Sequence, residues 1–368
     1  AYDERGNVVE QAYFGTDGGP TLHKDGNHRL TRAYDERGNV VEQAYFGTDG
    51  APVLHSDEGY HRFTQAFDER GNLVEWAFFG TDGAPVLRSD EGYYHHMQAF
   101  DKRGNVVERA FFGTDGEPVL LPDWGYHRFT QAFDERGNVV ERAFFGTDEE
   151  PTLHKDGNHR LTRAYDERGN RVEEAYFGTD GEPVLQSSGG YHRLTQAYDE
   201  RGNRVEEAYF GTDGEPVLQS SGGYHRLTQA YDERGNEVEE AYFGTDGEPV
   251  LRSSGGYHRL TKAYDERGNR VEEAYFGTGG APVLRSDEGY HRLTKAFDQR
   301  GNLVEVAYSG PDGEPTLRKK EGVHRFTQAF DQRGNLVEQA YFGTDGEPVL
   351  QSSGGYHRLT QAYDERGN

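Results

Sequence analysis

The sequence contains no cysteine, and this absence excludes several kinds of chemistry. A chain without thiols forms no disulfide bond, binds no metal through a thiolate and has no cysteine nucleophile. The sequence also lacks any run of about 18 apolar residues, the length that a membrane-spanning helix needs. We therefore expect no membrane insertion, while the redox compartment stays open.

Apolar and basic residues are both scarce. Hydrophobic residues make up 33% of the chain and the mean hydropathy is −0.97, so a single thick globular core is not expected. The 40 Lys and Arg residues stand against 65 Asp and Glu residues, which gives a formal net charge of −25. Nucleic-acid backbones and anionic membrane surfaces attract clustered Lys and Arg, so we expect no nucleic-acid partner.

The most prominent feature of the sequence is its repetition. The heptapeptide Ala-Tyr-Asp-Glu-Arg-Gly-Asn opens the chain and returns along it with conservative changes. It starts at Ala1, Ala33, Ala66, Ala99, Ala132, Ala164, Ala197, Ala230, Ala263, Ala296, Ala329 and Ala362. The spacing is 33 residues nine times and 32 residues twice. We therefore predict one continuous array, residues 1–368, of eleven repeats of 32–33 residues and a seven-residue stub.

The array is predicted to be ordered and stacked. The 24 Tyr and 21 Phe residues lie mostly in register with the period, whereas disordered acidic segments are poor in aromatic residues. In stacked arrays each repeat buries its apolar face only against its neighbours. Neither end of the sequence carries an atypical polar capping repeat. We therefore expect the array to be part of a longer chain or filament, with copies associating end to end.

The repeat Ala197–Gln229 indicates where the chain turns. Its segment Asp199–Gly202 has Asp first and Gly fourth, which is typical of a type I turn closed by a glycine bulge in a hairpin. Gly211–Gly214 predicts a second turn. Pro216 lacks an N–H group, so the segment after that turn is expected to pair by only one or two bridges.

Two strands are expected around these turns, over Tyr224–Asp232 and Asn236–Gly244, because valine, threonine and aromatic residues favour strands. A hairpin folded at the turn between them pairs Thr228 with Glu240. The predicted fold class is all-β: an elongated tandem-repeat β-solenoid of stacked antiparallel hairpins with about 33 residues per repeat.

A short helix over Glu237–Phe243 is the alternative to the second strand. The positions of Glu237 and Glu240 hold very different residues in other repeats, such as Leu73 and Val306, so we interpret both positions as outward-facing. Residues three apart share a face of a helix but lie on opposite faces of a strand, which favours the helix. Seven residues make a marginal helix, which favours the strand. Both interpretations stay open.

Histidine recurs in a Tyr-His-Arg stretch, as at His192, His225 and His258. A catalytic histidine needs one defined set of partners, whereas a residue that returns with the period is more simply a packing group. The sequence contains no glycine-rich phosphate loop, no His-Glu-x-x-His and no Gly-x-Ser-x-Gly. We predict that the protein is not an enzyme.

The acidic turns raise the question of calcium. Asp199, Glu200 and Asp213 are candidate ligands, because calcium takes carboxylate and main-chain carbonyl oxygens. Their spacing matches neither the helix-loop-helix calcium loop nor the glycine-rich nonapeptide. An aspartate that caps its own turn explains Asp199 and Asp213 without an ion. We therefore predict no cofactor, with calcium as the alternative.

Irregular positions are where a specialised surface for a partner is expected. Trp76 and Trp124 could stack on sugar rings, which makes a glycan a candidate partner. His95 and His96 are further candidates for partner contact. They also stand near carboxylates, but the spacing matches no standard metal site.

The segment Tyr198–Phe210 resembles the tyrosine-aspartate (YD) repeats of bacterial Rhs-type cell-surface and toxin-shell proteins, which share a Tyr-Asp-x-x-Gly hairpin turn followed by a strand. The matching residues of the turn are Tyr198, Asp199 and Gly202. The resemblance implies extracellular bacterial β-architecture. The longer period and the second Thr-Asp-Gly-x-Pro turn differ from that family, so the closed shell of its members is not carried over.

These observations favour a non-enzymatic structural repeat protein that forms an extracellular stalk, fibre or filament. The alternative is a repeat scaffold or adhesin that binds a glycan or peptide polymer along its surface. Both hypotheses place the protein outside the cell or at the cell surface.

Overall fold

The computed structural model describes residues 1–363, which form 22 strands and no helix, and therefore no helix that could cross a membrane. The chain divides into two compact sections. The N-terminal section consists of Ala1–Tyr165 and Glu174–Ser187, and the C-terminal section of Asp166–Glu173 and Ser188–Asn368. Most of the predicted stub, residues 364–368, lies outside the described residues.

Most repeats contribute a strand of six residues and a strand of seven residues. The strands are β1 (Glu10–Ala12), β2 (Arg29–Tyr34), β3 (Val40–Phe46), β4 (Arg62–Phe67), β5 (Leu73–Phe79), β6 (His95–Phe100), β7 (Val106–Phe112), β8 (Arg128–Phe133), β9 (Val139–Phe145), β10 (Arg160–Tyr165), β11 (Arg171–Phe177), β12 (Arg193–Tyr198), β13 (Arg204–Phe210), β14 (Arg226–Tyr231), β15 (Glu237–Phe243), β16 (Arg259–Tyr264), β17 (Arg270–Phe276), β18 (Arg292–Phe297), β19 (Leu303–Ser309), β20 (Arg325–Phe330), β21 (Leu336–Phe342) and β22 (Arg358–Thr360).

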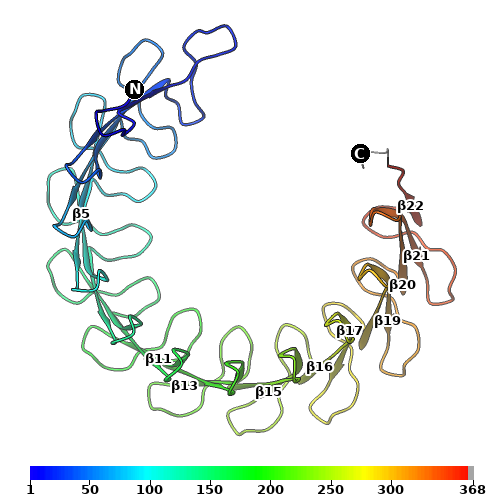
Figure 1. Ribbon diagram of the computed structural model, residues 1–368. Helices are drawn as coiled ribbons and strands as arrows, with labels where there is room; N and C mark the ends of the chain where they lie inside the picture. The colour runs from blue at the N-terminus through cyan, green and yellow to red at the C-terminus, as the bar shows by residue number, and fades with distance from the viewer. Residues whose placement is uncertain (364–368) are drawn as a thin grey trace. The chain divides into compact units, whose positions relative to one another are not determined.

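The strands pair antiparallel and in chain order within each section. In the N-terminal section the pairing runs from β1 to β10, and in the C-terminal section it runs from β12 to β22. Figure 1 shows the strands of each section as a band with loops on both of its sides. The prediction of an all-β array of successive antiparallel hairpins is confirmed, and the helix alternative is wrong.

The predicted turns form as the sequence indicates. Between β14 and β15 the Asp232 N–H donates to the Asn236 carbonyl at 2.9 Å, and the Gly235 N–H donates to the Asp232 carbonyl at 3.1 Å. Gly235 has a φ of +85°, a conformation that glycine adopts without steric cost. The segment after the second turn makes a single bridge, between Phe210 and Pro216, as the missing proline N–H predicts.

The predicted register is wrong by one residue. Thr228 pairs with Ala241 instead of Glu240, although Tyr231 pairs with Glu237 as a simple hairpin requires. The register shifts between Ala230 and Tyr231, so that Val238 is an extra residue in β15 and forms a bulge. The same shift occurs in the hairpin β12–β13 and in the hairpin β16–β17.

The bulge explains why residues three apart share a face of this strand. Gln229 lies opposite Glu240 in the register, and its side-chain amide also donates to Glu237 at 3.2 Å. The interpretation as outward-facing is also wrong at the position of Glu240, whereas at the position of Glu237 the Arg204 and Arg270 side chains are 34% and 36% exposed. At the position of Glu240, Glu207 is 7% exposed and Val306 is 3% exposed. The variation among repeats therefore lies on a partly buried face, where charged residues and valine replace one another.

The first face of the sheet, here called the tyrosine face, carries Leu227, Tyr242 and the equivalent residues. Loops fold over this face and add a second tyrosine per repeat, such as Tyr257, so that aromatic rings alternate between strand and loop. Ring centroids lie 4.8 Å apart between Tyr224 and Tyr242, 5.9 Å between Tyr242 and Tyr257, and 4.8 Å between Tyr257 and Tyr275. Each repeat thus buries its rings against those of its neighbours, as a stacked array requires.

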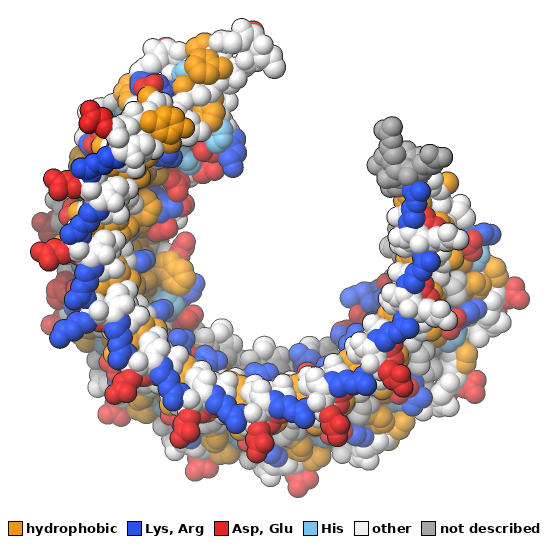
Figure 2. All heavy atoms as spheres, viewed as in Figure 1, with side chains coloured by type: hydrophobic (Ala, Val, Ile, Leu, Met, Phe, Trp, Pro, Cys, Tyr) orange, Lys and Arg blue, Asp and Glu red, His pale blue; other side chains and the backbone are white. Residues whose placement is uncertain are grey.

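The opposite face, here called the arginine face, carries Arg226, Phe243 and the equivalent residues. The guanidinium of Arg226 lies 4.5 Å from the centroid of the Phe243 ring and forms an ion pair with Glu206 of the preceding hairpin at 3.1 Å. The side chains of this ion pair are partly exposed, so the arginine face holds its charges at the solvent boundary. In the view of Figure 2, Lys and Arg side chains follow one another along the visible surface, with Asp and Glu side chains beside them.

Candidate functional site

Trp76 lies on the tyrosine face and is partly buried. Its ring centroid is 5.8 Å from that of Phe63, 5.1 Å from that of Phe78 and 5.8 Å from that of His96. The indole therefore packs against the aromatic core of the N-terminal section, which leaves little of its surface for a sugar ring.

Trp124 lies in a loop and is 43% exposed. The Lys155 ammonium stands 3.8 Å from the centroid of its ring, and the His154 ring lies 5.5 Å away. Of the two tryptophans, Trp124 is therefore the one that presents its ring to solvent, and a ligand would meet it beside a cation.

His95 and His96 lie on opposite faces of β6, because successive side chains of a strand alternate. His95 belongs to the arginine face, where its Nε2 atom lies 3.2 Å from a Glu75 carboxylate oxygen. His96 is 4% exposed on the tyrosine face, where Nδ1 lies 3.3 Å from the Tyr93 hydroxyl. Burial, with a smaller contribution from Arg109, lowers the pKa of His96 to about 3. The structure does not bring the two histidines together.

The candidate calcium ligands lie in two different turns. The Asp199 carboxylate accepts hydrogen bonds from the main-chain N–H groups of Arg201 and Asn203 and from the Asn203 side chain, each at 2.9 Å. The Asn203 side chain is the largest cause of the lowered pKa of Asp199. Asp213 accepts from the Glu215 N–H at 3.0 Å in the turn at the other end of β13.

The structure therefore places Asp199 and Glu200 in one turn and keeps Asp213 away from them. Among residues 1–363 no group of three or more His, Asp or Glu side chains has an arrangement that could hold a metal ion. The carboxylates of Asp199 and Asp213 act within their own turns.

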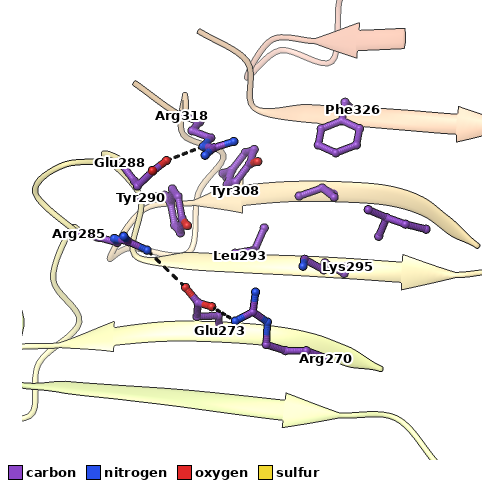
Figure 3. A pocket seen from close by; sticks show the side chains of 12 residues that line it. Arg270, Glu273, Arg285, Glu288, Tyr290, Leu293, Lys295, Tyr308, Arg318 and Phe326 are labelled. Carbon is purple, nitrogen blue, oxygen red and sulfur yellow. Dashed lines mark hydrogen bonds and ion pairs between the residues drawn. The ribbon is translucent and has the colours of Figure 1, made fainter. Parts of the chain in front are cut away.

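A cavity of about 400 Å³ lies on the tyrosine face of the C-terminal section and is the site that the sequence analysis missed. Figure 3 shows side chains from β17, β18, β19 and β20 on one side and from the connecting loops on the other. The strands contribute Arg270, Lys295 and Phe326, and the loops contribute Arg285 and Arg318. Cations therefore predominate in this cavity, although the chain as a whole is acidic.

The two carboxylates of the cavity already have cationic partners. Glu273 forms an ion pair with Arg270 at 2.6 Å, and Arg285 lies 3.8 Å from its other oxygen. Glu288 forms an ion pair with Arg318 at 2.5 Å, and Figure 3 shows both pairs as dashed lines. Hydrogen bonding to Arg318 is the largest cause of the lowered pKa of Glu288. Neither carboxylate is left over for Lys295.

Lys295 is the cation of the cavity without an ion-pair partner. Its cross-strand neighbour is Val306, and no carboxylate oxygen of the described residues lies within 4.0 Å of its ammonium group. Burial lowers the pKa of Lys295, the nearby Arg270 charge adds to the effect, and the Glu273 charge opposes it to a smaller extent. At the same position one repeat earlier, Lys262 forms an ion pair with Glu237 at 2.7 Å. The sequence signal for the unpaired lysine was Arg270, which stands where the preceding repeat has Glu237.

Comparisons with known proteins give structural neighbours only. No family model matches the chain, and no curated protein matches it. The chain is similar to the structure of TcdB2-TccC3 without its hypervariable C-terminal region, with 11% identity over 94% of this chain and 16% of that chain and a TM-score of 0.42. For TcdB2-TccC3 itself the identity is 13% over 92% of this chain and 21% of that chain, with a TM-score of 0.28.

A porin-like protein from Bacteroides uniformis is a further neighbour, with 11% identity over 90% of this chain and 92% of that chain and a TM-score of 0.17. The chain thus spans about a fifth or less of the length of the two toxin-complex chains.

Proposed function

We propose that the chain is a segment of a non-enzymatic structural repeat protein that forms a stalk, fibre or filament outside the cell. The observation that carries the proposal is that most repeats make the same set of contacts with the next repeat. Arginine guanidinium groups, glutamate carboxylates and main-chain N–H groups are used in these contacts between repeats.

The hairpin turns are connected to one another by arginine. The Arg234 guanidinium donates to the carbonyl oxygens of Asp265 and Glu266 in the next turn, at 3.3 Å and 2.6 Å. Arg267 makes the same contacts with the carbonyls of Asp298 and Gln299. Because carbonyl oxygens are present whatever the side chain, this connection tolerates sequence drift in the turns.

The loops are connected by the main chain. The Ser253 N–H donates to the Gly222 carbonyl at 2.9 Å, and the Ser220 N–H donates to the Gly189 carbonyl at 2.9 Å. These main-chain bonds recur along each section. So do the stacked tyrosine rings and the ion pairs equivalent to Arg226–Glu206. A structure held together in this way lengthens by adding copies, which suits a stalk or filament.

Two experiments test the proposal. Electron microscopy of the full chain is expected to show extended particles, and compact globular particles would contradict the fibre. Analytical ultracentrifugation over a range of concentrations tests end-to-end association, since a chain that stays monomeric at every concentration does not associate. A peptide of one repeat, Ala197–Gln229, is expected to be unfolded.

The outside-the-cell location rests on the resemblance of Tyr198–Phe210 to the Rhs-type repeats, and localisation of the tagged protein in its host tests it. The proposal includes no cofactor. Calcium remains the alternative, and a melting temperature that is equal in chelator and in excess calcium would remove it.

A second candidate function is a scaffold that binds a polymer along its surface. One leucine per repeat, at the second position after the proline, is 46–67% exposed. These residues are Leu22, Leu54, Leu87, Leu120, Leu153, Leu185, Leu218, Leu251, Leu284, Leu317 and Leu350. A row of apolar side chains with the period of the array suits a ligand that is itself periodic.

Binding on a glycan array that disappears in Trp124→Ala would favour a glycan as that polymer. The matched control is Trp76→Phe, which keeps an aromatic ring in the core and is expected to leave binding unchanged. Loss of binding in the control alone would contradict a role for the exposed ring.

A further inference from the structure

The position of Val306 normally holds a carboxylate in this part of the array. The three preceding repeats have Glu207, Glu240 and Glu273 at this position. A residue of the neighbouring strand lies directly opposite each of these glutamates. Gln196 and Gln229 are the first two of these opposite residues, and Lys262 lies opposite Glu273. In the next repeat the lysine is kept as Lys295, but its opposite residue is Val306.

The ion-pair partner of the preceding lysine is also absent in this repeat: Lys262 pairs with Glu237, and Arg270 stands at the position of Glu237. Arg270 and Arg318 are paired with the carboxylates of Glu273 and Glu288, and Arg285 forms an ion pair with Asp287 at 2.8 Å. Lys295 forms no such ion pair: burial is the main cause of its lowered pKa, Arg270 repels its charge, and the attraction by Glu273 offsets only part of this. A partly buried cation without a counter-charge is costly, and an anion from solution would remove the cost.

The remaining walls of the cavity are apolar. Leu303, Val306 and Phe326 line it beside Lys295, and Tyr290 and Tyr308 stand on the loop side (Figure 3). A volume of about 400 Å³ lies in the range of small-molecule sites, which combine mostly apolar walls with a few polar groups that fix the ligand. An inorganic anion would leave these walls unfilled.

We propose that this cavity binds a free small carboxylate with an apolar body. The carboxylate forms with Lys295 the ion pair that Glu237 forms with Lys262 in the preceding repeat. The apolar body packs against Leu303, Val306 and Phe326. This binding site lies within the scaffold but is independent of the proposed structural role.

Titration of the full chain with sodium benzoate, followed by calorimetry or by NMR shifts, tests the proposal. We expect saturable binding with one site in the millimolar range or tighter, because the ligand makes one ion pair and fills the apolar part of the cavity. Benzamide has the same ring without the charge, and inorganic phosphate has charge without the ring. Both are expected to bind at least about tenfold more weakly than benzoate, because each lacks one of the two contacts.

Two variants remove the site in different ways. Lys295→Gln installs the residue found at Gln229 and Gln328 and removes the cation. Val306→Glu restores the carboxylate of the preceding repeats, so that the chain supplies its own counter-charge. Each is expected to weaken benzoate binding by about tenfold or more. Both residues occur at these positions elsewhere in the array, and circular dichroism confirms that the variants fold.

Lys262→Gln is the matched control, because Lys262 already has Glu237 as its partner. It is expected to leave the benzoate affinity unchanged. The proposal is overturned if Lys295→Gln and Val306→Glu bind benzoate as the unaltered chain does, or if Lys262→Gln loses binding equally. It is also overturned if phosphate binds as well as benzoate, or if no saturable binding is found up to about 20 mM.

Discussion

The two faces of the sheet carry equally regular columns of side chains, but they differ in how much of each side chain is buried. On the tyrosine face Tyr242 is 2% exposed and Leu227 is 6% exposed. On the arginine face the side chains of the ion pair Arg226–Glu206 are 33% and 43% exposed. A residue that recurs in every repeat is therefore not necessarily buried. We expect most of the stability of the array to come from the tyrosine face.

The adjacent residues His95 and His96 show the same difference in burial between the two faces. His95 stands where other repeats have arginine, and His96 stands where they have leucine or phenylalanine. The first keeps a carboxylate neighbour at the surface, whereas the second enters the aromatic core as a neutral ring. The four predictions below test the comparison, from the largest expected effect to the smallest.

Tyr242→Ala is expected to have the largest effect. Removal of a fully buried aromatic ring leaves a cavity that neighbouring repeats cannot fill, which costs about 3–5 kcal/mol. The matched control is Phe243→Ala on the arginine face, whose ring is only half-buried, and a loss well below that of Tyr242→Ala is expected. Urea unfolding of both variants measures the difference. Equal losses from the two rings would show that the two faces contribute alike.

The pH dependence of stability is expected to be set in part by His96. Its pKa falls from 6.5 when unfolded to about 3 when folded, so the stability it contributes is complete above pH 6.5 and is lost as the pH falls toward 3. At about 1.4 kcal/mol per pH unit, the loss between pH 6.5 and pH 5 is about 2 kcal/mol.

His96→Leu restores the usual residue and is expected to remove this pH dependence, while His95→Arg on the other face is expected to keep it. Denaturant unfolding at pH 7 and pH 5 measures both. A His96→Leu variant that loses as much stability as the unaltered chain would place the titration elsewhere.

The turn between the faces is expected to give a smaller effect. Gly235→Ala forces a side chain into a backbone with φ of +85°, at about 1–2 kcal/mol, although the new methyl group would meet no other atom within 4 Å. Gly279 also has open space, but its φ is not positive, so Gly279→Ala is the control and is expected to cost nothing. Thermal unfolding of both variants would refute the backbone explanation if the two melted together.

Arg226→Ala is expected to have the smallest effect, at about 0.5–1 kcal/mol, because the ion pair with Glu206 is partly exposed and screened. Part of the loss comes from uncovering the Phe243 ring. The ionic part is expected to vanish in molar salt, which unfolding at low and high ionic strength measures. A loss that equals that of Tyr242→Ala would contradict the division of roles between the faces.

The sequence determined the features that depend on local chemistry. The period, the Asp-to-Gly turn at Asp232–Gly235 and the single bridge of Pro216 follow from residues that are neighbours in the chain, because turn geometry and a missing N–H group act locally. The dependence of each repeat on its neighbours also follows from composition and period alone.

The tertiary structure decided the register and everything that depends on it. One extra residue, Val238, moves Glu237 and Glu240 onto the same face, and no local pattern predicts a bulge at that residue. Variation at these positions could therefore be read as exposure, whereas at the position of Glu240 the residues Glu207, Glu273 and Val306 are buried. The cavity at Lys295 has the same origin, because the partner that a charge lacks becomes visible only when the neighbouring strands are placed side by side.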